Sequence, residues 1–131
     1  MTAFLDAIVL VRYLTGDSPD LTPRATAYLT GAEDLLLTDV IVAEVVFVLA
    51  SNYGYSRALI ADRLTRLIDL PSIVVDDARL LARALEVYDV DRIDFAEAYL
   101  VAAAERGGVG VIASFDRSLD RVATISRLEP R

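Results

Sequence analysis

Residues 3–14 read AFLDAIVLVRYL, a short apolar run that meets an acid at Asp6 and continues into a second apolar run. Ala3 to Leu5 is expected to form a short strand, and the apolar residues from Ile8 to Leu14 are expected to form a helix that ends near Gly16. The same order of strand and helix recurs along the chain, which is typical of an α/β domain with a mainly parallel sheet. This pattern decides the fold class.

Further elements follow from the same signals. Helices are predicted from Ser18 to Leu29, from Val40 to Tyr53, from Ser56 to Leu70, from Asp76 or Asp77 to Val90, and from Asp94 to Arg106. Strands are predicted at Leu35–Thr38, Ile73–Val75, Val109–Ala113 and Thr124–Ser126, with a turn or short helix at 116–121. Asp39 is the expected cap of the helix from Val40. With neither linker nor repeat in its 131 residues, we expect a single domain over 1–131.

The composition narrows the chemistry. The chain contains neither Cys nor His, and all 13 of its basic residues are Arg. Cysteine nucleophiles, Ser–His triads, thiolate or imidazole zinc sites and lysine-based phosphate loops all need residues that are missing. The net charge of −7 argues against loose coating of nucleic acid. Any catalysis must therefore use carboxylates.

The hydropathy pattern bears on location and assembly. The chain is 55% hydrophobic with a mean hydropathy of +0.45, which suggests an apolar surface covered by a second copy or a partner. No apolar run approaches the roughly 20 residues of a membrane helix, and Asp6 interrupts the first run, unlike a signal peptide. We expect a cytoplasmic protein without membrane association.

Several acids are placed where they can share a metal ion. Asp6 and Asp116 follow predicted strands, and ligands of open parallel sheets bind beyond the carboxyl ends of strands. Glu44 is the only charge in 40–50, and burying an unpartnered ion is costly. Asp94 and Glu97 lie on one helical turn. Converging carboxylates repel, and Mg²⁺ or Mn²⁺ would neutralise them and support phosphodiester hydrolysis.

Structural roles compete with this interpretation. Asp94 and Glu97 have the spacing of a capping box, and Asp6 can cap the first helix. Asp116 and Ser114 suit turn chemistry equally well. Arg12, Arg92, Arg117 and Arg121 lie nearest the acids and are weak candidates for phosphate contacts.

Four motifs in register resemble the PIN domain, and they extend over nearly the whole chain. The motifs are Phe4-Leu5-Asp6, Leu37-Thr38-Asp39 through Glu44, Asp94-Phe95-Ala96-Glu97-Ala98-Tyr99-Leu100, and Ser114-Phe115-Asp116. Their order and spacing are similar to those of VapC-type toxins. The resemblance implies a three-layer α/β/α sandwich around a small parallel sheet.

The resemblance also implies a function. Members of this family are metal-dependent endoribonucleases, usually homodimers, and a small VapB-type antitoxin inhibits the toxins. Asp6, Glu44, Glu97 and Asp116 would hold Mg²⁺, with Mn²⁺ as a possible substitute. Asp94 would support the same metal, and Ser114 would match the family's hydroxyl residue and contact the RNA substrate.

Two positions depart from the family's usual pattern and keep an alternative open. Ile8 stands where Asn, Ser or Thr is common, and Glu97 stands where Asp is usual. A degenerate module that binds antitoxin or RNA without cleaving is therefore the second hypothesis. A phosphoaspartate protein, such as a receiver domain or a haloacid-type phosphatase, is the third hypothesis. Those families rely on a Lys, and this chain contains none.

Overall fold

The computed structural model describes residues 1–31 and 34–131, which form two compact units, residues 1–76 and 77–131. The first unit contains β1 (Ala3–Phe4), α1 (Ala7–Thr15), α2 (Leu21–Gly31), β2 (Leu35–Leu36), α3 (Asp39–Ser51), α4 (Arg57–Ile68) and β3 (Ile73–Val74). The second contains α5 (Ala78–Val90), α6 (Phe95–Gly107), β4 (Val111–Ala113), the 3₁₀ helix η1 (Arg117–Arg121) and β5 (Ser126–Leu128). All strand pairs are parallel, as the sequence predicts.

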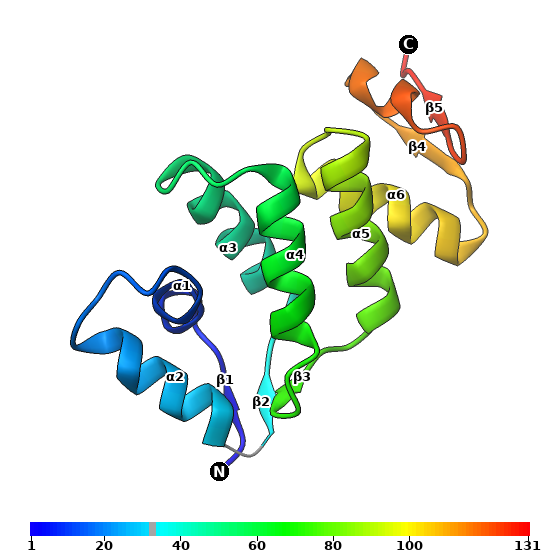
Figure 1. Cartoon of the computed structure of the whole chain (residues 1–131). Helices are drawn as coiled ribbons and strands as arrows, with labels where there is room; N and C mark the ends of the chain where they lie inside the picture. Colours follow the sequence, from blue (N-terminus) through cyan, green and yellow to red (C-terminus); the bar gives the residue numbers. More distant parts are fainter. Residues whose placement is uncertain (32–33) are drawn as a thin grey trace. The chain divides into compact units, whose positions relative to one another are not determined.

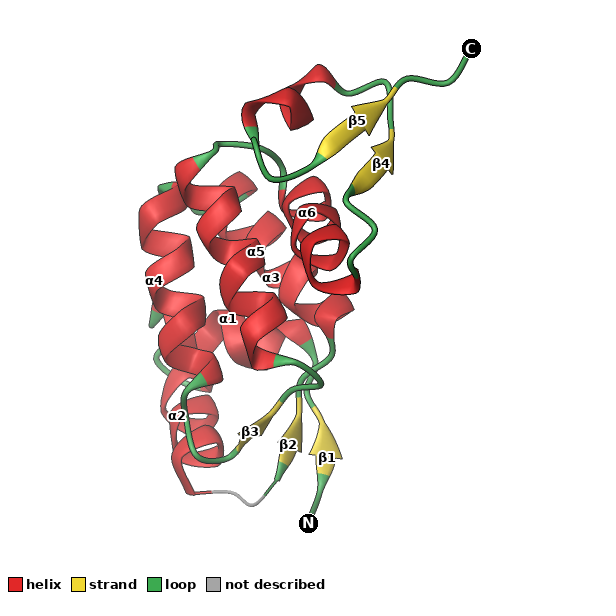
Figure 2. Cartoon of the chain, turned by 90° about the vertical axis from the view of Figure 1, so that its right-hand side faces the viewer, coloured by secondary structure: helices red, strands yellow, loops and turns green. Residues whose placement is uncertain are grey.

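The first unit is built on a three-stranded sheet of order β1-β2-β3, visible in Figures 1 and 2. Ala3 pairs with Leu35, and Leu35 pairs with Ile73, so the three strands end at one edge. The Leu5 N–H donates to the Leu36 carbonyl at 2.9 Å, and the Leu37 N–H donates to the Val74 carbonyl at 2.9 Å. Asp6 and Thr38 therefore leave the sheet at this carboxyl edge.

Apolar faces of the helices form the core of the first unit. Helix α1 packs on both α2 and α3, and α3 packs on α4. The largest fully buried side chains here are Leu10, Val11, Leu29, Leu35, Leu49, Ile60, Leu64 and Leu67. Burying each such side chain contributes on the order of 2 kcal/mol, and this packing fixes the direction in which the chain leaves β1.

Helix ends follow capping chemistry, with two corrections to the sequence prediction. The hydroxyl of Thr38, rather than the carboxylate of Asp39, caps α3 by accepting the Ile41 N–H at 3.3 Å, because the helix begins one residue earlier than predicted. Helix α2 begins at Leu21, so Pro19 lies in the preceding turn, although Ser18 still accepts the Leu21 N–H at 3.0 Å. Gly16 closes α1 with a φ of 66°, as expected of a C-terminal glycine.

The second unit places a parallel strand pair beside a helical hairpin. Helices α5 and α6 pack closely, and α6 leads through Gly108, at a φ of 76°, into β4. Ile112 pairs with Arg127 in the β4–β5 ladder. Strand β5 lies at 126–128 instead of the predicted 124–126, because η1 and the turn after it use more of the chain than a tight connection would.

An ion-pair cluster joins the two helices of this unit. The Arg83 guanidinium donates to both carboxylate oxygens of Glu105, at 2.8 and 2.9 Å, and also donates to Glu86. The Thr124 hydroxyl also hydrogen-bonds Glu105. Arg83 lowers the pKa of Glu105 chiefly by donating to its carboxylate. The cluster ties α5, α6 and the chain before β5 together.

Glu105→Gln should destabilise the protein by about 1 kcal/mol at neutral pH. A bidentate ion pair within a network contributes more to the free energy of unfolding than an isolated surface pair does. Because the folded pKa is lowered, Glu105 contributes this stability above its unfolded pKa, near the reference value of 4.5, and the contribution is lost as pH falls through the folded pKa. Urea unfolding of both proteins from pH 7 to pH 3 measures the difference. An equal loss at both ends of this range would contradict the ionic origin.

Candidate metal and nucleic-acid site

Asp6 stands at the junction of β1 and α1. Its neighbours Leu5 and Ala7 are buried at 5% and 6% exposure, whereas Asp6 itself is exposed. Its Oδ1 accepts the Ala7 N–H at 2.8 Å, so the carboxylate caps α1. This hydrogen bond uses one of the two oxygens, and capping is therefore compatible with a metal-binding role.

Glu44 lies on the second turn of α3, and its side chain is exposed. The buried residues of this helix are Val42, Val45, Val46 and Leu49, which leaves Glu44 off the buried face. The inference that a buried Glu44 needs a metal or an Arg is therefore wrong, because exposure lets water solvate the carboxylate. Its role as a metal ligand stays a prediction.

Asp94 directly precedes α6, and Glu97 lies in the first turn of this helix. Asp94 is the N-cap residue, with extended backbone, but its side chain makes no capping hydrogen bond. The competing capping-box interpretation is therefore wrong on the Asp94 side. Asp94 is exposed and Glu97 is half-buried one turn later.

Asp116 caps η1 just beyond β4. Its Oδ1 accepts the Ser118 N–H at 2.9 Å, and its own N–H donates to the Ser114 hydroxyl oxygen at 2.9 Å. The pKa of Asp116 is lowered, mainly by the Ser118 hydroxyl and N–H and further by the nearby charges of Arg121 and Arg127. The carboxylate is therefore ionised at neutral pH, and Ser114 orders the turn that presents it.

Arg127 contacts the same turn and was missed by the sequence reasoning. Its side chain, 12% exposed, donates to the Ser114 carbonyl at 3.1 Å and to both oxygens of Asp120, at 3.0 and 3.1 Å. The predicted strand at 124–126 stopped before this residue. No sequence signal identified Arg127, because its place opposite Ile112 is set by the β4–β5 register.

Two of the four arginines named from the sequence, Arg12 and Arg121, have side-chain hydrogen-bond partners within the protein. Arg12 donates to both oxygens of Asp17, at 3.2 Å each, and to the Tyr53 hydroxyl. Arg121 donates to the Arg92 carbonyl at 2.8 Å, and Arg92 has a φ of 58°, a left-handed conformation uncommon outside glycine. Phosphate contacts by these residues stay predictions.

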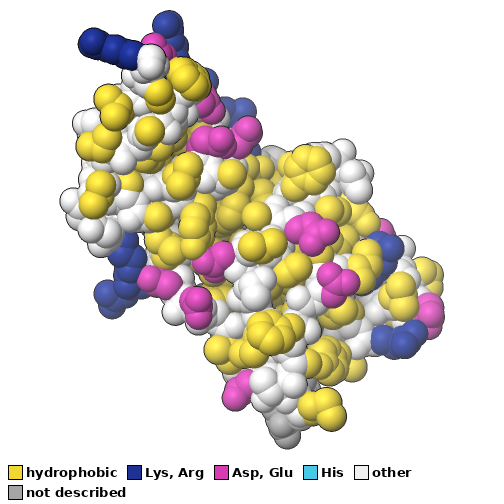
Figure 3. Space-filling model, turned by 180° about the vertical axis from the view of Figure 1, so that it is seen from behind, with side chains coloured by type: hydrophobic (Ala, Val, Ile, Leu, Met, Phe, Trp, Pro, Cys, Tyr) yellow, Lys and Arg dark blue, Asp and Glu magenta, His cyan; other side chains and the backbone are white. Residues whose placement is uncertain are grey.

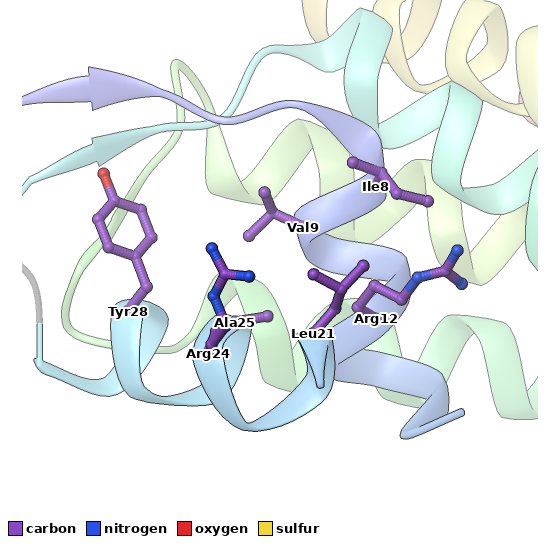
Figure 4. A pocket seen from close by; sticks show the side chains of 7 residues that line it. All are labelled: Ile8, Val9, Arg12, Leu21, Arg24, Ala25 and Tyr28. Atoms are coloured by element: carbon purple, nitrogen blue, oxygen red, sulfur yellow. The ribbon is translucent and has the colours of Figure 1, made fainter. Parts of the chain in front are cut away.

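A groove of about 370 Å³ lies between α1 and α2 (Figure 4). Its lining is mostly apolar, with two guanidinium groups, and consists of Ile8, Val9, Arg12, Leu21, Arg24, Ala25 and Tyr28. Ile8 is 48% exposed and follows Asp6 by two residues. Arg24 is paired with Asp20 at 3.6 Å.

The candidate carboxylates divide between the units. Asp6 and Glu44 belong to residues 1–76, and Asp94, Glu97 and Asp116 belong to residues 77–131. Within residues 1–31 and 34–131, neither unit by itself gathers three or more acidic side chains around a point that could hold a metal ion. Metal binding by these carboxylates therefore stays a prediction.

Comparison with known proteins identifies the family. The PIN domain family matches residues 3–125, almost the entire chain. PIN domains are typically nucleases and commonly use divalent metal ions, and the match confirms the predicted PIN-like α/β fold class. No curated protein matches the sequence significantly, and no helix in the described part of the chain has the length and apolar character needed to cross a membrane. The chain belongs to the PIN domain family.

Proposed function

We propose that this protein is a Mg²⁺-dependent endoribonuclease that acts as the toxin of a type II toxin–antitoxin pair. The family match supports a nuclease at the coarse level. The lack of Cys, His and Lys leaves carboxylates as the only side chains able to hold a catalytic cation. The four acidic motifs are similar to those of VapC-type toxins, and this similarity supports the more specific proposal of an RNA-cleaving toxin.

The placement of Asp6 and Asp116 is the main structural support for the proposed nuclease activity. Each follows a parallel strand, is exposed, and uses Oδ1 to accept a backbone N–H at the start of the next helical segment. The donors are all oxygen, which fits Mg²⁺ or Mn²⁺ and excludes the soft ligands of a structural zinc site. Bound Mg²⁺ would activate water and offset charge on the leaving oxygen.

The remaining residues have assigned roles in this proposal. Glu44 and Glu97 complete the metal-holding set with Asp6 and Asp116, and Asp94 supports Glu97 from one turn earlier. Ser114 holds the backbone of Asp116 and offers its hydroxyl hydrogen to a substrate phosphate. The carboxylates therefore bind and orient, while RNA selectivity depends on the surrounding surface.

Partners follow from the same proposal. A VapB-type antitoxin inhibits the enzyme, and two copies form a homodimer in the cytoplasm. Support for an assembly comes from the many apolar side chains at the surface, some of which are seen on the face drawn in Figure 3. Phe47 is 68% exposed and Phe115 is 72% exposed. The charge of −7 suits a basic inhibitor.

A second candidate is a PIN-like module that binds RNA or antitoxin without cleaving. Ile8 favours it, because this exposed residue on α1 has no group able to hydrogen-bond the nearby Asp6 or a water molecule. Glu97 adds a methylene where Asp is usual. Mn²⁺ titration separates the two candidates, since only the nuclease requires a bound cation.

Purified protein should cut labelled total RNA in Mg²⁺ or Mn²⁺ and should lose cutting in EDTA, because the proposed mechanism relies on the bound cation to activate water and to offset charge on the leaving oxygen. Restoring excess Mg²⁺ after EDTA should restore cleavage. Persistent cutting in EDTA would overturn the metal-dependent mechanism. Failure to cut under every condition, together with RNA retention in a gel shift, would favour the binding module.

A further inference from the structure

Arg127 joins three parts of the second unit through one guanidinium. Its Nη1 donates to the Ser114 carbonyl at 3.1 Å and to Glu129 at 3.1 Å, while Nε and Nη2 donate to the two oxygens of Asp120. The side chain is 12% exposed and starts from β5, opposite Ile112 of β4. These contacts link β5, the end of β4 and η1.

The two main anchors of Arg127 flank Asp116. Ser114 precedes Asp116 by two residues and accepts its N–H through the hydroxyl, and Asp120 follows it by four residues within η1. The Asp116 segment, residues 114–121, is thus held at both ends by one side chain. Asp116 itself accepts the Ser118 N–H between these anchors.

We propose that Arg127 is a positioning residue that holds the Asp116 segment in the geometry required for metal binding. This inference rests on the proposed function and extends it to a residue beyond the matched positions 3–125. Arg127 touches neither metal nor substrate in this proposal. It acts through Ser114 and Asp120, and a shift of about 1 Å in a ligand can lower catalysis by about 100-fold.

Arginine is the suitable side chain for this role. Its planar fork bonds a carbonyl on one side and both oxygens of a carboxylate on the other, whereas a lysine ammonium lacks that geometry. The other bidentate pair of this unit, Arg83 with Glu105, joins α5 to α6. Among the described residues, Arg83 donates to Glu86 and Glu105 and to none of residues 114–121. Arg83→Gln is therefore a matched control.

Hydrogen exchange measured by NMR provides a readout that needs no catalysis. The N–H groups of Asp116, Ser118 and Leu119 all bond within the Asp116 segment. In Arg127→Gln these amides should exchange roughly tenfold faster, because the segment opens more often. Arg127→Lys should fall between Arg127→Gln and wild type, and Arg83→Gln should leave these three amides unchanged.

Metal binding and kinetics test the consequence for the site. Arg127→Gln should raise the apparent Kd for Mn²⁺ alone several-fold, on the order of 5-fold, and lower kcat for RNA with little change in KM. Unchanged amide exchange or unchanged Mn²⁺ affinity in Arg127→Gln would overturn the proposal, even in an active nuclease. A wild type that neither binds Mn²⁺ nor cuts RNA would overturn the proposed function and, with it, the positioning of a metal ligand by Arg127. The amide exchange rates would then still show whether Arg127 holds the Asp116 segment.

Discussion

Asp6→Asn is expected to lower kcat/KM for RNA cleavage on the order of 1,000-fold while leaving the fold intact. Asn has nearly the size of Asp and caps helices about equally well, so the hydrogen bond to the Ala7 N–H persists. The substitution removes the negative charge that a cation needs. The measurement is metal-dependent cleavage of labelled RNA, with thermal unfolding to confirm the fold.

Asp62→Asn is the matched control for this change. Asp62 is an exposed acid on α4 that pairs with Arg66 at 3.2 Å, and no role in metal binding is assigned to it. Its substitution should leave cleavage within about twofold of wild type. Cleavage retained by Asp6→Asn at the wild-type rate would count heavily against the carboxylate site.

Leu10→Ala is expected to destabilise the protein by about 2–5 kcal/mol. Leu10 is fully buried at 0% exposure on α1, the helix that packs on both α2 and α3. Truncation removes apolar contacts and leaves a cavity that the surrounding helices can fill only in part. Urea denaturation would show the loss as a lower midpoint at an unchanged slope.

Ile8→Ala on the same helix provides the comparison. Ile8 is 48% exposed, so its truncation removes little buried area and should change stability by less than about 1 kcal/mol. Equal losses for the two variants would show that α1 is not anchored through Leu10. The pair also tests whether Ile8 matters for function independently of folding.

The fold was largely predictable because its signals are local. Periodicity placed all six helices of the described chain and four of the five strands within a few residues. Gly16 ends α1, and Ser56 and Asp77 cap the N-termini of α4 and α5, as capping chemistry predicts. The fifth strand was displaced, because its position depends on pairing with β4 rather than on its own short sequence. The single-domain organisation stays a prediction.

The candidate site was less predictable, because the exposure and the partners of a charged side chain depend on tertiary packing. The apolar surroundings of Glu44 in sequence suggested burial, yet the helix turns this carboxylate away from its buried residues. Asp6 and Asp116 were identified correctly as acids following strands, since chain order alone determines that feature. Arg127 could not be found without the β4–β5 register, which brings residues 13 positions apart into hydrogen-bonding distance.

The dual role of Asp6 has an evolutionary consequence. Because the capping hydrogen bond tolerates an amide in place of the carboxylate, one amino-acid change can silence catalysis in a protein that still folds. Such a silent copy would keep its surfaces and would compete with active copies for the proposed antitoxin. Under the proposed function, loss of cleavage and loss of the fold are thus separate events, and one substitution leaves a folded protein that binds without cutting.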